Sequence, residues 1–286
     1  MVTVHGIYVT SLFFNPEKGQ STFLLKPEPG SCQDYVSEHG NIKVVGRFCL
    51  EQKNMPLAID GDWHTSEYGP ELHIRNIVET SCTKQETVDF IRELNAMISP
   101  RDIRRIAGIV GGDIFSASEN LSMEEKICSK TKADFVSVSD VFKKVRRLKR
   151  ELDLFKFLGE YNGTYEHCMK LMKKYPTDAL EMVLHKPYEV ARNVNIPFHI
   201  MDRIALDQGI DRLTEERIAA ILYWCMKKES GSGNAYVTFE QLYKIVAKQF
   251  KDIPKEAVEN PLKNHPFIKT DPNFRSEEHT SELQSQ

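Results

Sequence analysis

The spacing of the hydrophobic residues changes near residue 80 of this 286-residue chain, and the change separates two kinds of fold. Before it, short runs rich in β-branched and aromatic residues are divided by Gly, Pro and Asn, as in β-strands and turns. After it, apolar residues recur every three or four positions, as in amphipathic helices. We therefore predict an α+β multidomain chain in which a small β-barrel precedes an all-α region.

The barrel is expected within residues 1–79. Its strands are expected at Val4–Thr10, Ser21–Lys26, Ile42–Glu51, Leu57–Trp63 and Glu71–Val78. Gly46 suggests a bulge or a bend. The OB-fold matches a closed barrel of this size best. We expect the rings of Phe23, Phe48 and Trp63 to fill its core. Acidic residues outnumber basic ones here, which favours protein docking over binding of single strands.

The helical part begins with Lys84–Met97, for which Thr83 is the expected N-cap, and continues in a helix that ends at Val110. A longer helix is expected at Ser139–Leu158. Its apolar stripe consists of Val138, Val141, Val145, Leu148, Leu152 and Phe155. A helical hairpin then runs from Phe157 to Tyr175, with its turn at Asn162-Gly163-Thr164.

These patterns predict a barrel at 1–79, a first hairpin region with a basic helix at 80–158, and a second hairpin with a helical bundle at 159–250. Turn signals at Asn195–Pro197, Gly209 and Ser230–Asn234 divide the bundle. A Pro-interrupted linker is expected at 251–274. Residues 275–286, RSEEHTSELQSQ, read as a translated sequencing adapter, so we set them aside as a non-native tail and expect the native reading frame to be interrupted there.

Composition narrows the class of protein. The formal net charge is −3, so bulk charge does not indicate a binder of polyanions. The six cysteines are scattered without a C-x-x-C pair, which argues against a zinc ribbon or a disulfide framework. The sequence shows no signal peptide and no apolar run near the roughly 18 residues that span a membrane. We expect a cytoplasmic protein without a membrane partner.

Catalytic motifs are missing from the sequence. It contains no G-x-x-x-x-G-K-[ST] and no H-E-x-x-H, and the dipeptide Gly-Lys does not occur. His64 and His73 have no third ligand nearby in sequence and are interpreted as surface or hydrogen-bonded residues. We therefore predict no catalytic residue, cofactor site or metal site in this sequence.

The strongest positive signal is a run of cations on the helix expected at Ser139–Leu158. Lys143, Lys144, Arg146, Arg147, Lys149 and Arg150 place six cations in eight residues on the polar side of that helix. Contacts of this kind bind DNA phosphates and release counterions. The alternative is a solvated face balanced by Glu151 and Asp153. Arg101, Arg104 and Arg105 form a second cluster, for which an exposed helix face is the alternative.

Two stretches carry a resemblance to a known family. The stretch that begins at residue 184 contains HKPYEV, FHIMDRIALDQGI, ERIAAILYWC and GSGNAYVTFEQL, the last of which ends at Leu242, and residues 61–72 read GDWHTSEYGPEL. Together they resemble the region upstream of the motor in RecD/TraA-family ATP-dependent DNA helicases, in the long stand-alone bacterial RecD-like form. The resemblance implies an N-terminal barrel, tandem helix-hairpin-helix motifs and DNA as partner. For the parent enzyme it implies ATP, Mg²⁺ and 5′-to-3′ unwinding by a motor that is missing from this sequence.

The family's hairpin turn is Gly-apolar-Gly, which lets backbone N–H groups approach a DNA phosphate. The first hairpin departs from this pattern, because its turn is Met97-Ile98-Ser99. The second keeps Gly163, and with Thr164 it joins Arg101, Arg104 and the six cations above as an expected DNA contact. Asp202 and Arg217 are interpreted as a structural ion pair or as caps, and Tyr188 and Tyr223 as packing residues.

Two rival functions remain open at this point. One is a stand-alone DNA-binding protein with the same modules and no motor. The other is a protein-interaction scaffold that never contacts DNA.

Overall fold

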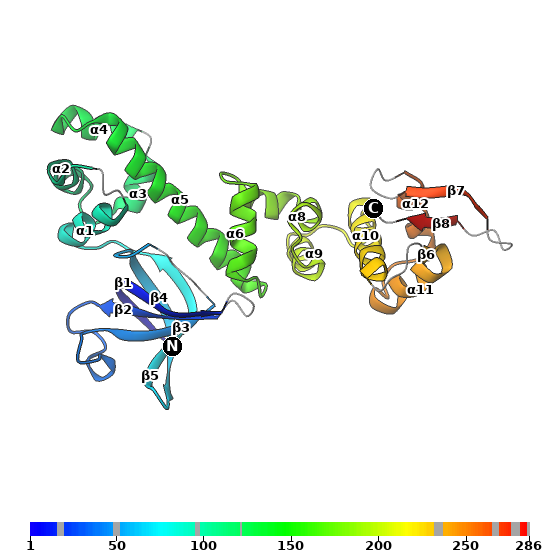
Figure 1. Ribbon diagram of the computed structural model, residues 1–286, viewed down its shortest axis with the longest axis horizontal. Helices are drawn as coiled ribbons and strands as arrows, with labels where there is room; N and C mark the ends of the chain where they lie inside the picture. Colours follow the sequence, from blue (N-terminus) through cyan, green and yellow to red (C-terminus); the bar gives the residue numbers. More distant parts are fainter. Residues whose placement is uncertain are drawn as a thin grey trace. The chain divides into compact units, whose positions relative to one another are not determined.

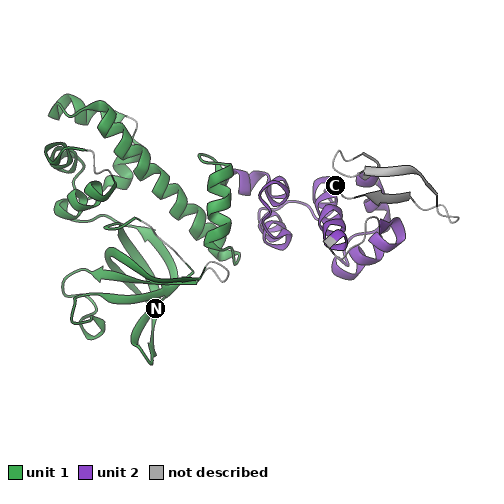
Figure 2. Cartoon of the chain, viewed as in Figure 1, with its two compact units in different colours: residues 1–180 green, residues 181–286 purple. Residues whose placement is uncertain are grey.

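The computed structural model describes residues 1–15, 20–47, 52–94, 98–120, 122–231, 237–264, 269–275 and 281–284. The chain forms two compact units, residues 1–180 and residues 181–286 (Figure 2). This division falls at a different place from the segment boundaries expected near residues 158 and 250.

The first unit begins with a closed five-stranded barrel (Figure 1). Its strands are β1 (Val2–Asn15), β2 (Gln20–Pro27), β3 (Ile42–Gly46), β4 (Pro56–Ser66) and β5 (Gly69–Glu79), with a 3-10 helix, η1 (Gln33–Tyr35), between β2 and β3. The order is β1-β2-β3-β5-β4, and β4 pairs with β1 to close the barrel. The β3–β5 pair is parallel and the other pairs are antiparallel. The predicted OB-like barrel is therefore confirmed.

The barrel core follows the alternation of its strands. Tyr8, Phe23, Leu25, Leu57 and Ile59 are buried, and the exposed fraction of each is at most 2%. This burial confirms the predicted core role of Phe23. Burying a side chain of this kind stabilises the fold by about 1.5–3 kcal/mol.

Trp63 is not one of the fully buried core residues that we expected. It pairs with the buried Leu72, but its ring is only half-buried and stacks on Tyr35, with centroids 4.0 Å apart and ring planes 8° apart. Tyr35 comes from η1, a segment for which the sequence analysis predicted no structure, so this partner could not be foreseen. Phe48 lies outside the described residues.

Close packing, rather than the expected bulge or bend, explains the glycine at position 46. It pairs in register with Ser21, and a Cβ at this position would lie 2.8 Å from Cδ1 of Ile74 in β5. Glycine therefore lets β5 approach closely. The β4–β5 ladder is irregular between Asp60 and Gly61 instead.

Helices complete the first unit. They are α1 (Lys84–Leu94), α2 (Pro100–Val110), α3 (Ile114–Glu119), α4 (Ser122–Thr131), α5 (Phe135–Glu160) and α6 (Tyr165–Lys174), and α7 (Ala179–His185) crosses into the second unit. Thr83 caps α1 as predicted, because its hydroxyl accepts the N–H of Glu86 at 3.2 Å. Helix α5 begins earlier than expected because Asp134 caps it through the N–H of Ser137. Helices α3 and α4 were not predicted.

The apolar stripe of α5 faces α3, α4 and the barrel strand β5, and its residues are buried except for Leu148, which is half-buried. At the other end of α5, Phe14 of β1 meets Tyr165 of α6 edge-on, with ring centroids 5.5 Å apart. These contacts join barrel and helices into one body, which fixes the polar face of α5 relative to the barrel.

The second unit contains α8 (Pro187–Val194), α9 (Phe198–Asp207), α10 (Glu215–Gly231), β6 (Val237–Thr238), α11 (Phe239–Gln249), α12 (Lys255–Asn264), β7 (Lys269–Arg275) and β8 (Ser281–Gln284). The turn signals at Asn195–Pro197 and Gly209 are confirmed as the ends of α8 and α9. Of the last turn signal, Ser230–Asn234, the first two residues end α10 and residues 232–234 lie outside the described residues.

The linker expected at 251–274 belongs to the fold. Ile253, Val258 and Leu262 are buried in the same core as Leu222 and Leu242 of α10 and α11. Pro261 lies inside α12, so proline did not prevent a helix here. The short strands β6, β8 and β7 form a sheet in that order. Strand β8 falls in residues 275–286, which the sequence analysis set aside from the fold.

Candidate nucleic-acid interface

Helix α5 presents two cations to solvent. Its apolar stripe packs inward, so the opposite face projects outward. Lys143 and Arg147 are exposed there, one helical turn apart. No hydrogen bond or ion pair joins either side chain to another described residue. Their charges are therefore available to an anion.

Arg146 of the same helix has a structural role. Its guanidinium donates to the carbonyl oxygen of Ser118 and to Oε1 of Glu124, each at 2.8 Å. These bonds tie α5 to α3 and α4. The charge of Arg146 is already paired, so the structure removes this residue from the cations that face solvent.

Lys149 is also held inside the unit. Its ammonium lies 3.1 Å from Glu79 of β5 and 2.8 Å from Glu119 of α3. Burial alone would lower the pKa of Lys149, but the hydrogen bonds to Glu119 and Glu79 outweigh burial and raise it. Lys149 thus connects the barrel to the helices rather than facing a ligand.

Two further cations of the run have intermediate positions. Lys144 pairs with Asp140 at 2.9 Å on a half-exposed surface, an arrangement that contributes little stability and leaves the ammonium accessible. Nε of Arg150 is buried and has no hydrogen-bond partner among the described residues. The predicted run of six cations therefore separates into different environments.

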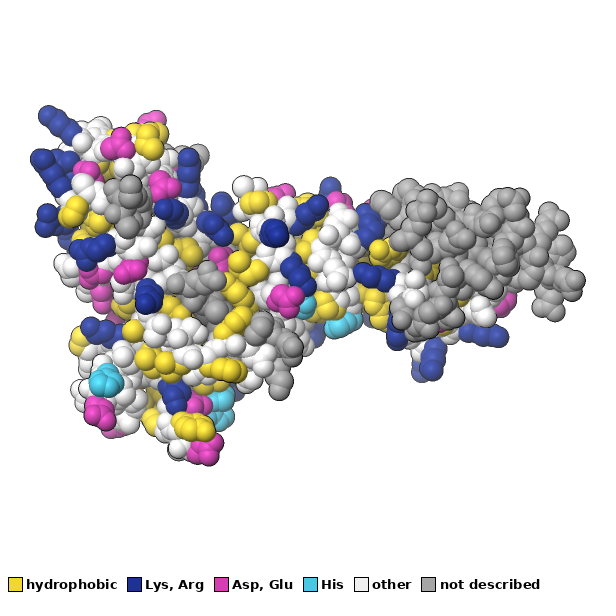
Figure 3. All heavy atoms as spheres, viewed as in Figure 1, with side chains coloured by type: hydrophobic (Ala, Val, Ile, Leu, Met, Phe, Trp, Pro, Cys, Tyr) yellow, Lys and Arg dark blue, Asp and Glu magenta, His cyan; other side chains and the backbone are white. Residues whose placement is uncertain are grey.

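Helices α2 and α4 form a second basic surface at one end of the first unit. Arg101 and Arg104 are exposed on α2, as are Lys126 and Lys130 on α4, and the two helices pack together. Figure 3 shows Lys and Arg side chains gathered over these helices. Arg105 differs from its neighbours because it pairs with Asp102 at 2.9 Å. The two lysines were not singled out in the sequence, because α4 was not predicted.

The turn between α5 and α6 is closed by its own hydrogen bonds. The N–H of Gly163 donates to the carbonyl oxygen of Leu158 at 2.7 Å. Thr164 caps α6 in a capping box, in which its N–H donates to Nδ1 of His167 and its hydroxyl accepts the N–H of His167. Both backbone donors are thus already in use, so direct phosphate contacts through Gly163 and Thr164 would require these bonds to open.

A groove of about 710 Å³ adjoins that turn. It lies between strands β3 and β5 and the last turns of α5, and Arg47, Arg75 and Lys156 line it. Arg47 donates to Oδ1 of Asn162 in the turn at 3.3 Å, and Arg75 pairs with Asp62. This basic lining is not evident in the sequence, because its residues come from three distant segments.

The first predicted hairpin, α1 and α2, keeps its departure from the family pattern. Met97 lies outside the described residues. Ser99 is the N-cap of α2, and its side chain accepts the N–H of Asp102 at 3.1 Å. The exposed cations of α2, rather than this turn, are therefore the part of the hairpin that could meet a phosphate.

Helices α8 and α9 form another hairpin, which the sequence analysis did not identify as one. Its turn is Asn195-Ile196-Pro197, and Asn195 has the left-handed conformation, with φ 56° and ψ 43°, that a glycine adopts at least cost. Pro197 then precedes α9 and carries no N–H. The turn therefore has a left-handed residue at its first position and, because of Pro197, one backbone donor fewer than a Gly-apolar-Gly turn.

Asp202 and Arg217 form the predicted structural ion pair. Both side chains are buried between α9 and α10, and the hydroxyl of Tyr188 donates to Asp202 at 3.0 Å. The interpretation of Tyr188 as a packing residue with a satisfied hydroxyl is confirmed.

Other kinds of site find little support in the described residues. The rings of His64 and His73 have centroids 4.3 Å apart and planes tilted by 46°. Among the described residues, no group of three or more His, Cys, Asp or Glu could hold a metal ion. The described cysteines are free thiols, and burial raises the pKa of Cys225 to about 12.

Across the described ranges, no helix is both long enough and apolar enough to cross a membrane.

Comparison with known families identifies one domain. Residues 148–236 match the family model of the ATP-dependent RecD2 DNA helicase HHH domain, where HHH denotes helix-hairpin-helix. A search of the curated proteins finds no match to the chain. The matched segment contains the end of α5, α6 and the α8–α9 hairpin. This similarity to the helix-hairpin-helix domain of ATP-dependent RecD2 DNA helicases supports the prediction that the chain is the N-terminal region of a RecD2-type helicase.

Proposed function

We propose that this chain is a DNA-binding accessory region of an ATP-dependent helicase that unwinds DNA from 5′ to 3′. In this proposal a separate motor domain uses ATP and Mg²⁺, and the helical part of this region guides the DNA backbone. The observation that carries the proposal is the match of residues 148–236 to the RecD2 helix-hairpin-helix domain.

The surface charge supports DNA as the partner. Lys143 and Arg147 are exposed and unpaired among the described residues, and exposed cations gather on α2 and α4. Each cation that neutralises a phosphate releases counterions and adds affinity that depends on salt. Contacts to phosphates do not depend on the base sequence, which suits an accessory region that follows a moving strand.

Binding of a labelled single strand and a labelled fork tests the proposal. We expect fluorescence anisotropy to show saturable binding of both DNAs by the intact chain. The double variant Lys143→Ala/Arg147→Ala should bind more weakly at unchanged stability. A matched control is Lys26→Ala/Lys53→Ala, which removes the same charge from exposed positions of the barrel and its loops. Equal affinity of the two double variants would contradict the proposal.

A second candidate function is protein docking on the barrel. Leu12 and Phe13 lie side by side in β1 with 53% and 56% of their surfaces exposed. Adjacent exposed apolar residues are a feature of protein interfaces. A scaffold that never contacts DNA would show no saturable binding of either labelled DNA in the same titration, which separates the two functions.

A further inference from the structure

A groove of about 750 Å³ lies in the second unit between α8, the Asn195–Pro197 turn and α10. Its volume is within the range of ligand sites, about 300–1,000 Å³. Small side chains leave this space open, because Ala191 of α8 and Ala219 and Ala220 of α10 line it. The resemblance to helicases gave no role to Ala219 and Ala220.

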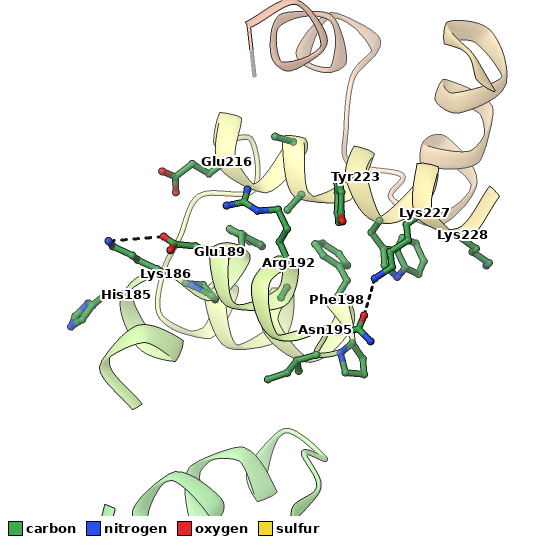
Figure 4. Close-up of a pocket in the computed structure, with 18 residues that line it drawn as sticks. His185, Lys186, Glu189, Arg192, Asn195, Phe198, Glu216, Tyr223, Lys227 and Lys228 are labelled. Carbon is green, nitrogen blue, oxygen red and sulfur yellow. Dashed lines mark hydrogen bonds and ion pairs between the residues drawn. The ribbon is translucent and has the colours of Figure 1, made fainter. Parts of the chain in front are cut away.

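Cations outnumber carboxylates around the groove. Among its described lining residues, the cations are Lys186, Arg192, Lys227 and Lys228, and the carboxylates are Glu189 and Glu216. Lys227 donates to Oδ1 of Asn195 at 2.8 Å, so the left-handed residue of the turn positions this ammonium at the rim. Figure 4 shows this bond and shows Arg192 rising from α8 toward α10. The charge balance favours an anionic occupant.

An aromatic ring reaches into the same space. Figure 4 shows Tyr223 extending from α10 toward α8 and α9. Its neighbour Trp224 is packed against Phe198 and Phe250, with ring centroids 5.7 and 6.2 Å away. Tyr223 is half-exposed, and no ring contact or hydrogen bond links it to another described residue. Its ring face is thus available for stacking.

We infer that this groove binds a short single-stranded segment of DNA, with a base stacked on Tyr223 and its phosphates beside Lys227 and Arg192. A cationic groove combined with an aromatic ring is how proteins hold single strands without reading sequence. A duplex buries its base faces in the stack, so it offers nothing to Tyr223. An acidic peptide would satisfy the cations but would leave the ring unused. The inference rests on the proposed function and adds where a single strand is held.

Fluorescence of Trp224 tests the groove. The chain has two tryptophans, so Trp63→Phe leaves Trp224 as the single reporter beside the groove. We expect an oligothymidylate of about eight nucleotides, within the usual site sizes, to change this emission saturably. In that background, Tyr223→Ala should weaken oligonucleotide affinity by about 5- to 150-fold, the range for loss of one stacked base, whereas Tyr223→Phe should bind nearly as well.

Two further variants make the result decisive. Lys227→Glu keeps the ring and should also weaken binding, which guards against a folding defect in Tyr223→Ala. Tyr68→Ala, at an exposed tyrosine of the barrel, should have no effect. The inference is wrong if Tyr223→Ala and Lys227→Glu bind like their parent, or if a poly-glutamate peptide changes the emission and the oligonucleotide does not. If the chain binds DNA but these variants are silent, the proposed function survives without the groove; if the chain binds no DNA, both fail.

Discussion

Arg217 holds Asp202 through two parallel hydrogen bonds, 2.8 Å from Nε to Oδ1 and 3.0 Å from Nη2 to Oδ2. Arg217 also donates to the carbonyl oxygen of Arg212 at 2.8 Å, and Tyr188 donates to Asp202. Burial, followed by the charge of Asp202 and the hydrogen bond to it, raises the pKa of Tyr188, which keeps its hydroxyl a donor. One buried carboxylate therefore joins α8, α9 and α10.

Asp202→Ala should lower the free energy of unfolding of the second unit by about 3–5 kcal/mol, because it removes the bidentate partner of a buried guanidinium and leaves only the more distant Asp252, 3.8 Å from Nη1. Tyr188→Phe removes one hydrogen bond and should cost only about 1 kcal/mol. Urea unfolding followed by Trp224 emission in the Trp63→Phe background measures both. Similar costs for the two variants would show that the pair does not organise this core.

Neighbouring arginines of α5 should behave in opposite ways. Arg146→Ala leaves Glu124 buried without its partner and should cost about 1–3 kcal/mol of stability. Arg147→Ala lies on the surface and should change stability by less than about 0.5 kcal/mol. It should instead weaken DNA binding. Thermal unfolding and DNA titration of both variants check this, and a destabilised Arg147→Ala would mean that the polar face of α5 is misassigned.

Asp153→Asn should stabilise the protein at neutral pH. Burial first, and then the charge of Glu79, raise the pKa of Asp153. An acid with a raised pKa costs stability above its folded pKa, and the cost disappears as the pH falls toward the ordinary value of about 3.9. Urea unfolding at neutral and acidic pH should therefore give a gain for Asp153→Asn that shrinks on acidification. A loss at neutral pH would contradict the electrostatic account.

Gly163→Ala should destabilise the α5–α6 hairpin by about 1–3 kcal/mol, as an overpacked side chain does. The new Cβ would lie 2.7 Å from Cβ of Leu158 and 2.8 Å from its carbonyl oxygen. Gly159→Ala is the matched control, because a Cβ there meets nothing within 4 Å. This substitution also replaces a flexible glycine inside a helix with a better helix former. It should be neutral or stabilising in thermal unfolding. Equal effects at both glycines would indicate that the Gly163 contact is not tight.

Local patterns explain what could be predicted from the sequence. Strand alternation, the Thr83 cap and the stripe of α5 depend on neighbouring residues, so they were readable in advance. The pairing of Arg146 with Glu124, and of Lys149 with Glu79 and Glu119, depends on segments far apart in the chain. A run of charged residues in a sequence therefore does not reveal which of its cations form ion pairs inside the fold and which face solvent.

The most direct test is the salt dependence of DNA binding by the intact chain. We predict that the logarithm of the association constant for a single strand falls linearly with the logarithm of salt concentration. Each phosphate contact contributes a slope of about −0.7, so Lys143→Ala/Arg147→Ala should reduce the slope by about 1.4, and Lys26→Ala/Lys53→Ala should leave it unchanged. Binding that does not weaken as salt rises, or an unchanged slope in the α5 variant, would contradict the proposed role of this region as a guide for DNA.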